Sequence, residues 1–259
     1  MTAGVPAMFR LDGRSAAVTG AGRGIGRAVA IGFAEAGARL AITDIDLPAA
    51  EETAAAIRRN GGEAIAVALD VADEASVERG FKRIAEAHGG IDVLFNNAGI
   101  TMRRPSVGLS LADWERVVAV NMTGVFLCAR TAARLMIAGR GGSIVNMASV
   151  MGLSGSRVLP DISYQATKGA IVNMTRALAL EWAKAGIRVN AMAPAWVRTD
   201  FIKWLLDRPE LVKRMNAMMP LGRLAEPSDV VGAVLFLASP ASAMVTGHTL
   251  PVDGGVLAQ

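Results

Sequence analysis

The feature of this sequence that most limits its fold is a regular alternation of short apolar runs with longer helical stretches. The runs, rich in β-branched residues, cover residues 15–20, 39–44, 63–70, 91–97, 142–149, 187–194 and 248–255. The helical stretches cover residues 24–36, 48–59, 73–88, 113–138, 164–185 and 227–238. Continuous apolarity favours strands buried on both faces, as in a parallel sheet. The alternation therefore predicts one doubly wound α/β domain over residues 1–259, with about seven parallel strands and helices on both faces.

Composition places the chain in a broad class. Of 259 residues, 52% are hydrophobic and 19% are charged, which is typical of a globular protein with a sizeable core. No apolar run approaches the roughly 18 residues of a spanning helix, and the N-terminus lacks the apolar region of a secretory signal. The one cysteine, Cys128, cannot form an internal disulfide, which agrees with a reducing compartment. We expect a cytoplasmic protein with no membrane partner.

Charge and histidine content argue against two other classes of site. The net charge of +4 is spread along the chain, and aromatic residues do not interleave with basic ones, so no nucleic-acid surface is expected. His88 and His248 are the only histidines and neither stands in a ligand-like cluster. No metal site is therefore predicted.

A glycine-rich segment, VTGAGRGIGRA, follows the first predicted strand and opens the first predicted helix. Its glycines allow a tight turn close to a pyrophosphate, and the helix N-terminus offers free N–H groups to that anion. The spacing is not the strict GxGxxG, because Ile25 stands where the third glycine would fall. Its place between strand and helix still predicts dinucleotide binding by a Rossmann-type domain. The residues expected at the cofactor are Gly20, Arg23, Gly24, Ile25 and Gly26.

Two charged groups bear on which dinucleotide binds. The second predicted strand ends at Asp44, 24 residues after Gly20, where a carboxylate can accept hydrogen bonds from the adenosine ribose and repel a 2′-phosphate. Asp46 adds negative charge. Arg23 favours NADP instead, because a guanidinium in the loop could pair with a 2′-phosphate. The balance predicts NAD, with NADP possible.

Tyr164, the only tyrosine, precedes Lys168 by four residues, so the two share one face of a helix. A free phenol has a pKa near 10 and is a poor base at neutral pH. A neighbouring ammonium favours the phenolate and turns tyrosine into a usable general acid or base. Ser149 closes the predicted strand 142–149, at the carboxyl end where open α/β sheets bind ligands. These residues predict proton transfer at a substrate oxygen.

Taken in order, the motifs resemble those of the short-chain dehydrogenase/reductase family over about residues 11–255. The family's TGxxxGxG loop stands at residues 19–26, its NNAG motif at residues 96–99 and its YxxxK motif at residues 164–168. Its catalytic serine corresponds to Ser149 and its helix asparagine to Asn121. Any one motif could be accidental, but the whole set in order is highly specific.

The resemblance implies a role for each of these residues. Tyr164 would exchange a proton with the substrate, while Lys168 would lower the pKa of Tyr164 and hold the nicotinamide ribose. Ser149 would orient the substrate oxygen, and Asn121 would seat a water linking Lys168 to solvent. The cofactor carries the hydride. Further cofactor contacts implied by the resemblance are Asp70, Val71, Asn97, Ala98, Gly99, Val197 and Thr199. Asp70 has an alternative role as a cap before the next helix.

Two departures from the family pattern affect the substrate side. Ala195 stands where glycine is usual after the proline, and Ser149 and Tyr164 are 15 residues apart where about 13 is commoner. The extra length falls in GLSGSRVLPD, where Ser154 and Ser156 are rival hydroxyls that close no strand.

Residues 196–219 lie where the family carries its substrate lid. Their tryptophans, methionines and leucines either wall an apolar pocket or pack the lid onto the body. Arg103, Arg104 and Arg157 either meet a carboxylate or polyol or are surface charge. The segments NNAGITMRRP and ADWERVVAVNMTGVF look most like family members that act on polyols, sugars and sugar acids.

We therefore expect an oxidoreductase that interconverts a secondary alcohol and a ketone. The alternatives are a 3-oxoacyl thioester reductase using NADPH and a non-catalytic dinucleotide-binding regulator on the same fold. The complete set of Asn121, Ser149, Tyr164 and Lys168 counts against the regulator. The resemblance also implies a homotetramer that packs through helices near 113–138 and 164–185.

Overall fold

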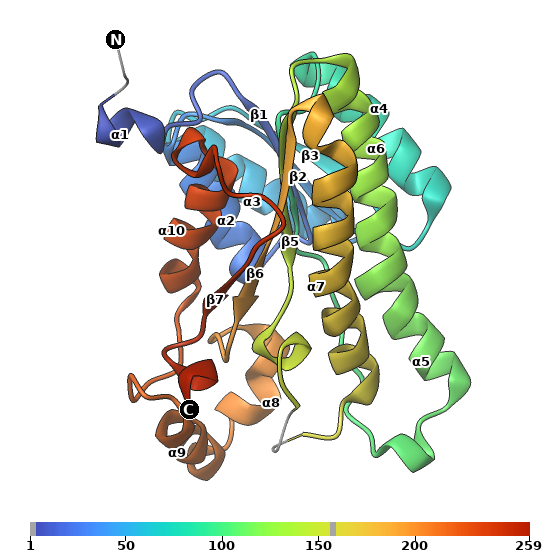
Figure 1. The fold of residues 1–259 in the computed structure, drawn as a ribbon, viewed down its shortest axis with the longest axis vertical. Coiled ribbons are helices and arrows are strands. Elements are labelled where there is room, and N and C mark those ends of the chain that lie inside the picture. Colours follow the sequence, from blue (N-terminus) through green and yellow to red (C-terminus); the bar gives the residue numbers. More distant parts are fainter. Residues whose placement is uncertain (1–3, 156–158) are drawn as a thin grey trace.

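Seven parallel strands form one twisted sheet in the order β3-β2-β1-β4-β5-β6-β7 (Figure 1). The computed structural model describes residues 4–155 and 159–259. The strands are β1 (Ser15–Thr19), β2 (Arg39–Asp44), β3 (Ala64–Ala68), β4 (Val93–Asn96), β5 (Gly142–Met147), β6 (Ile187–Pro194) and β7 (Thr249–Val252). Chain order reverses direction across the sheet at β1, which pairs with both β2 and β4. Ligands of open α/β sheets bind at such a switch point, outside the carboxyl ends of the strands.

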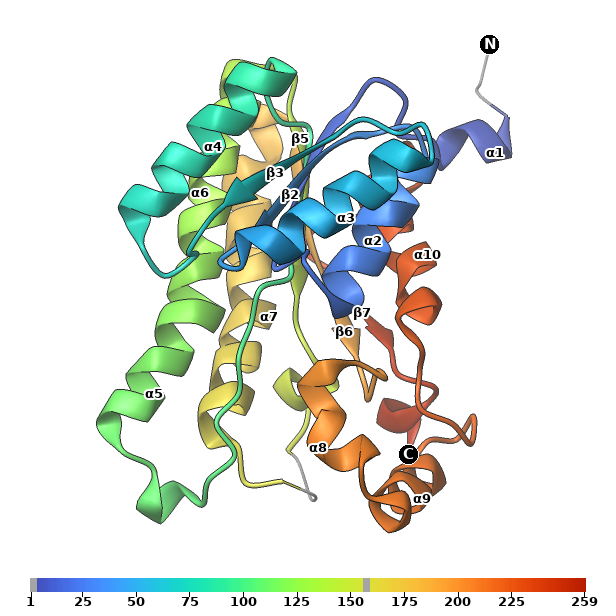
Figure 2. The same cartoon turned by 180° about the vertical axis from the view of Figure 1, so that it is seen from behind.

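Helices cover both faces of this sheet, as the two views in Figures 1 and 2 show. On one face lie α2 (Gly24–Glu35), α3 (Leu47–Arg59) and α10 (Pro227–Ala238). On the other lie α4 (Glu74–His88), α6 (Gly124–Ala138) and α7 (Ile162–Trp182), with α5 (Leu111–Val118) leading into α6. Three shorter helices are α1 (Val5–Met8), α8 (Lys203–Leu206) and α9 (Pro209–Met218). The last two lie together beyond the carboxyl ends of the strands.

The inner strands β1, β2, β4, β5 and β6 are buried on both faces, as their continuous apolarity predicts, whereas the edge strands β3 and β7 are only partly buried. Along β1, Ala16 and Val18 belong to the core under α2 and α10, whereas Ala17 belongs to the core under α4 and α6. Successive strand side chains point to opposite faces, so an apolar residue at every position supplies both cores. The sheet is thereby held between two helix layers, and only its ends are free to form a site.

Local sequence also sets where several helices begin. Asp46, Asp73 and Ser110 stand just before α3, α4 and α5, and the side chain of each accepts a hydrogen bond from a first-turn N–H. Such caps satisfy backbone donors that have no partner within the helix. The alternative role of Asp70, as the cap of this helix, is thus taken by Asp73.

The predicted fold class is confirmed, and the differences are local. The helix expected over 113–138 is interrupted by one π-helical segment, Ala119–Thr123, between α5 and α6. Strand β5 ends at Met147, so Ser149 follows the strand rather than closing it. The helices α1, α8 and α9 were not predicted. In the described part of the chain, no helix is both long and apolar enough to cross a membrane.

Candidate active site

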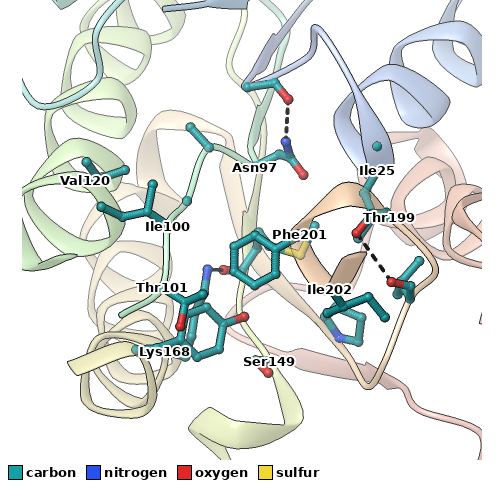
Figure 3. Close-up of a pocket in the computed structure, with 18 of the residues that line it drawn as sticks. Ile25, Asn97, Ile100, Thr101, Val120, Ser149, Lys168, Thr199, Phe201 and Ile202 are labelled. Carbon is teal, nitrogen blue, oxygen red and sulfur yellow. Dashed lines mark hydrogen bonds between the residues drawn. The ribbon is translucent and has the colours of Figure 1, made fainter. Parts of the chain in front are cut away.

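A cavity of about 770 Å³ opens at the carboxyl ends of β1, β4, β5 and β6, beside the switch point of the sheet. Figure 3 shows some of its walls, with Ile25, Asn97, Ser149, Lys168 and Thr199 directed toward one space. Most residues expected at the cofactor or at the reacting atoms line it. They are Gly20, Arg23, Gly24, Ile25, Asp44, Asp70, Val71, Asn97, Ala98, Gly99, Ser149, Tyr164, Lys168, Val197 and Thr199. Gly26 and Asn121 do not line the cavity, but each lies against residues that do line it.

The glycine-rich loop is shaped by backbone contacts that only glycine permits. Gly20 has a φ of 62°, and a Cβ there would lie 2.9 Å from the Cα of Ala98. A Cβ on Gly26 would lie 2.3 Å from the carbonyl oxygen of Gly20 and 2.6 Å from Nδ2 of Asn97. Helix α2 begins at Gly24, so its N-terminal N–H groups point toward the cavity. The loop thus forms a cradle suited to an anion, and Gly26 keeps it closed rather than lining it.

Asp44 sits at the end of β2 and is buried, with 8% of the residue exposed. Its Oδ2 accepts a hydrogen bond from the N–H of Gly22 at 2.9 Å, and its Oδ1 accepts one from the N–H of Asp46 at 3.0 Å. The carboxylate therefore braces the glycine-rich loop while it also lines the cavity. The exposed guanidinium of Arg23 lies 3.6 Å from Oδ2 of Asp46, so Asp46 partly offsets its charge.

The NNAG segment links the glycine-rich loop to the rest of the site. Asn97 Nδ2 donates to the carbonyl oxygens of Thr19 and Gly20, each at 2.9 Å; Figure 3 draws one of these two bonds. Thr19 Oγ1 accepts from the N–H groups of Asn97 and Ala98 at 3.0 and 3.1 Å. Asn96 instead points into the sheet, where its Nδ2 donates to Oδ1 of Asn146 at 3.0 Å. One asparagine therefore shapes the cavity and the other stabilises the central strands.

Asp70 and Val71 both line the cavity. Asp70 Oδ1 accepts from the N–H of Ala72 at 2.9 Å, and Asp70 N–H donates to Oγ of Ser76 at 3.0 Å. These bonds fix the turn before α4.

Asn121 lies in the π-helical segment and is fully buried. Its Oδ1 accepts from the N–H of Ile100 and its Nδ2 donates to the carbonyl oxygen of Ile100, both at 2.8 Å. Nδ2 also lies 3.4 Å from Oγ1 of Thr167 on α7. A π-helical turn inside an α-helix often marks a functional position. Here it turns the asparagine amide onto the backbone of the NNAG segment, so the side chain is already engaged and anchors that segment.

Ser149, Tyr164 and Lys168 come together from two elements. Ser149 precedes the short 3-10 helix Val150–Gly152, and its Oγ accepts from the N–H of Met151 at 3.2 Å. Tyr164 and Lys168 lie one turn apart on α7, with Nζ of Lys168 5.5 Å from the centre of the tyrosine ring. Nζ donates to the carbonyl oxygen of Met147, at the end of β5, at 2.6 Å. Strand and helix thus hold the ammonium beside the phenol.

Burial governs the titration of both groups. It raises the pKa of Tyr164 to about 12, against which hydrogen bonding to Ser149 and the charge of Arg103 act more weakly. It lowers the pKa of Lys168 to about 7, because the residue is only 2% exposed and meets no carboxylate. Desolvation thus favours the neutral form of each group, and Lys168 is not among the described residues that shift the pKa of Tyr164. The lowering of that pKa by Lys168 stays a prediction.

Val197 and Thr199 close the cavity from the side opposite α7. Val197 forms an isolated parallel bridge with Ala225, and Thr199 lies over the glycine-rich loop, 3.4 Å from where a Cβ on Gly24 would stand. Among the described residues no residue other than glycine has a positive φ. Ala195 therefore replaces the usual glycine of the family without backbone strain.

Residues 196–219 split between the two expected roles. Trp196, Phe201 and Ile202 line the cavity, and the Phe201 ring lies 5.9 Å from the Tyr164 ring. Leu205 and Met215 instead form a separate buried cluster with Ile202 and Leu224, against which Trp204, Leu206 and Met218 pack. The methionines therefore hold α8 and α9 together rather than walling the pocket.

The polar residues expected on the substrate side also divide into those that line the cavity and those that do not. Arg103 lines the cavity, whereas Arg104 lies outside it, 3.6 Å from the carboxylate of Asp113. Ser154 donates to the carbonyl oxygen of Val150 and does not line the cavity. Arg157 and Ser156 lie outside the described residues.

Sequence reasoning missed Thr101 and Asp161, which line the same part of the cavity. The position of Asp161, three residues before Tyr164 and next to the start of α7, was the available signal. Across residues 4–155 and 159–259, no three histidine, cysteine or acidic side chains are grouped so as to hold a metal ion.

Comparison with known proteins finds a matching family model and several proteins of similar sequence. A family model described as enoyl-(acyl carrier protein) reductase matches residues 20–257. Galactitol 2-dehydrogenase (L-tagatose-forming) of Cereibacter sphaeroides is 43% identical over 96% of both chains. D-threitol dehydrogenase of Mycolicibacterium smegmatis is 40% identical, over 95% of this chain and 94% of that one. A 3-oxoacyl-[acyl-carrier-protein] reductase of Synechocystis is 39% identical, over 96% and 99%.

Solved structures agree with these relatives. A short-chain type dehydrogenase/reductase from Mycobacterium marinum superposes with a TM-score of 0.95 at 36% identity, covering 99% of this chain and 100% of that one. A gluconate 5-dehydrogenase from Burkholderia cenocepacia, in complex with NADP and tartrate, gives 0.94 at 38% identity with the same coverage. Both matches extend over the glycine-rich loop, the NNAG segment and the tyrosine–lysine pair. The chain therefore belongs to the short-chain dehydrogenase/reductase family and is an oxidoreductase that acts on alcohol groups with a nicotinamide cofactor.

Proposed function

We propose that this protein interconverts a secondary alcohol and a ketone in a polyol or sugar, with NAD as its preferred acceptor. One observation carries the proposal: Ser149, Tyr164 and Lys168 meet in the same cavity whose other end is formed by the glycine-rich loop and Asp44. Proton-transfer groups and an anion cradle in one space suit a reaction in which a proton and a hydride leave the same substrate carbinol.

The chain fits a nicotinamide dinucleotide through groups already described. The loop from Gly20 to Ile25 would hold the pyrophosphate, Asp44 the adenosine ribose, and Asp70 with Val71 the adenine. Lys168 would hold the nicotinamide ribose, and Val197 with Thr199 the carboxamide. When bound, the nicotinamide accepts or supplies the hydride.

The proton follows a path through the protein's own side chains. Ser149 Oγ orients the substrate oxygen beside the Tyr164 hydroxyl. In the direction of ketone reduction, the neutral phenol favoured by burial donates its proton to that oxygen. In the direction of alcohol oxidation, the phenolate must form, and positive charge on Lys168 lowers its cost. Asn121 keeps the NNAG segment in place through Ile100, and we assign it a positioning role.

Support for NAD comes from Asp44. Its carboxylate is buried at the end of β2 and is held by the N–H groups of Gly22 and Asp46, so it cannot swing away from a 2′-phosphate. Arg23 is drawn toward Asp46 at 3.6 Å, which weakens its value as a phosphate partner. The gluconate 5-dehydrogenase neighbour was solved with NADP, and comparing NAD with NADP in one assay tests the preference of this chain.

Support for a polyol or sugar comes from the relatives named for galactitol and threitol. The 3-oxoacyl reductase relative and the description of the matching family favour a second candidate, the reduction of a 3-oxoacyl thioester with NADPH. Asp44 counts against it, because that reaction in the family generally uses the phosphorylated cofactor.

We also propose a homotetramer that packs through α6 and α7, with residues 196–219 acting as the substrate lid in a single domain. Phe126 and Ile137 on α6 and Leu180 on α7 are exposed apolar side chains, at 38%, 55% and 81%, and burial between subunits would remove them from water. The single buried cysteine accords with a cytoplasmic location.

The test is the appearance of reduced cofactor when the purified protein meets polyols, sugars, sugar acids, simple secondary alcohols and 3-hydroxyacyl thioesters. Each compound is tried with NAD and with NADP. Turnover of a polyol or sugar with NAD at the higher kcat/KM supports the proposal. Activity confined to hydroxyacyl thioesters with NADP would replace it with the second candidate.

A further inference from the structure

The substrate half of the cavity contains two opposite charges that the reaction itself does not need. Arg103 comes from the segment after β4, and Asp161 stands immediately before α7, three residues ahead of Tyr164. Both line the cavity, together with apolar neighbours such as Leu159 and Phe201. A charge in a largely apolar wall is costly unless something pairs with it, so each calls for a partner.

Arg103 is fixed in place without a carboxylate. Its guanidinium lies 4.7 Å from the centre of the Trp204 ring and 5.6 Å from that of Phe201, and its Nη2 donates to the carbonyl oxygen of Phe201 at 3.0 Å. Its Nε is buried and has no hydrogen-bond partner in the described part of the chain. No ion pair of Arg103 is found among the described residues. The group is therefore oriented by aromatic faces and retains unused donor capacity.

Asp161 faces it as an acceptor. The residue is 3% exposed, and its Oδ1 accepts a hydrogen bond from Nε2 of Gln165 at 2.5 Å. Arg103 acts on it through its charge and not through a contact, since no ion pair within 4.0 Å joins the two among the described residues. Both charges also act on Tyr164, in opposite directions. Donor and acceptor thus flank the reacting phenol with a net charge near zero.

A neutral hydroxyl completes this arrangement. Thr101 Oγ1 is buried, has no hydrogen-bond partner among the described residues and belongs to a residue that lines the same cavity, as Figure 3 shows. A hydroxyl both donates and accepts, so it can pair with another hydroxyl in either sense.

Resting on the proposed function, we propose that Arg103 and Asp161 together select a neutral polyol over the sugar acid of the same chain length. Each substrate hydroxyl can accept from the guanidinium and donate to the carboxylate, so a chain of hydroxyls satisfies both groups at once. A substrate carboxylate would be attracted by Arg103 but repelled by Asp161, and it offers Asp161 no proton. The pair therefore discriminates by charge as well as by hydrogen bonding.

The experiment compares kcat/KM for a six-carbon alditol, the matching aldonate and cyclohexanol, which carries no further hydroxyl. The variants are Asp161→Asn, which keeps an acceptor for Gln165, and Arg103→Gln. The wild-type protein should favour the alditol over the aldonate by tenfold or more. Asp161→Asn should shift this ratio at least tenfold toward the aldonate, and Arg103→Gln should shift it in the opposite direction. Cyclohexanol turnover measures how far each variant acts through Tyr164 alone, and the alditol-to-aldonate ratio is free of that effect because both substrates use the same phenol.

The neighbouring surface pair supplies charge-matched controls. Arg104→Gln and Asp113→Asn remove the same two charges outside the cavity and should leave the ratio unchanged. A wild-type preference for the aldonate, or a ratio that neither cavity variant moves, overturns the inference while alditol oxidation keeps the proposed function. If no alcohol is oxidised with either cofactor, the proposed function fails and the inference with it. Either cavity variant alone suffices should the other fail to fold.

Discussion

Replacing Lys168 by Met should change how the stability of the cofactor-free protein depends on pH. Burial lowers the pKa of Lys168 from its ordinary value of 10.5 to about 7. Between those pH values the unfolded chain binds a proton that the folded protein does not, so folding is favoured as pH rises through this range. Each pH unit fully inside it is worth roughly 1 kcal/mol. From pH 7 to pH 9 the wild-type protein should therefore gain about 2 kcal/mol relative to Lys168→Met, which has no such proton.

The measurement is urea unfolding at pH 6, 7, 8 and 9, without cofactor and at one fixed protein concentration. Lys184→Met is the matched control, because Lys184 is an exposed lysine in the turn that follows α7. Its pH profile should run parallel to that of the wild type. Comparing differences between variants cancels the groups that titrate identically in all three proteins.

Parallel profiles for the wild type and Lys168→Met would refute the reasoning. They would mean that the folded protein keeps Lys168 charged throughout, so that the carbonyl oxygen of Met147 at 2.6 Å compensates for the lost hydration. A profile in which the wild type loses stability relative to the variant as pH rises would contradict even the sign of the shift.

Three further outcomes are expected. Tyr164→Phe should lower kcat by a hundredfold or more, because it removes only the proton-transfer group. The dissociation constant of the cofactor, measured by nucleotide fluorescence, should change less than threefold, and unaltered turnover would defeat the mechanism. Asp44→Asn keeps an acceptor for only one of the two loop amides that Asp44 binds, and it removes a charge that repels a 2′-phosphate by about 3 kcal/mol at roughly 5 Å. The NADP-to-NAD ratio of kcat/KM should therefore rise at least tenfold, and no change would mean that another group selects the cofactor. Gly26→Ala should abolish cofactor binding, because its Cβ would meet the Gly20 carbonyl at 2.3 Å. Gly232→Ala, at an exposed position of α10 where a Cβ meets nothing within 4 Å, should instead stabilise the fold by about 0.5 to 1 kcal/mol; equal binding by both variants would show that the loop relaxes.

The sequence was most informative where one physical requirement fixes both residue type and position. Buried parallel strands need apolar residues on both faces, so all seven strands could be located, and their order at the switch point places the site at one edge of the sheet. Gly20 and the pair of Tyr164 and Lys168 could be assigned for the same reason. Each depends on contacts within a single element or between neighbouring ones.

Prediction from sequence was less successful where contacts between residues distant in the chain decide local structure or the position of a side chain. The π-helical turn at Asn121 depends on the backbone of Ile100, 21 residues away, and nothing in the local pattern of 113–138 marks it. Arg103 and Arg104 are neighbours with the same side chain, yet Trp204 and Phe201 hold the first over the cavity and Asp113 holds the second at the surface. Burial raises the pKa of Tyr164, and this desolvation of a side chain cannot be read from its spacing to a lysine.

The short stretch from Asn97 to Ile100 is fastened at both ends, to the glycine-rich loop by Asn97 and to the π-helical turn by Asn121. Its length therefore acts as a fixed spacer between the half of the site that would hold the dinucleotide and the helices that carry the proton-transfer groups. One inserted residue would force one of the two attachments to break. This stretch should consequently resist insertions and deletions, while new substrate specificity can arise in Arg103, Asp161 and the segment 196–219 without changing the distance between the two halves.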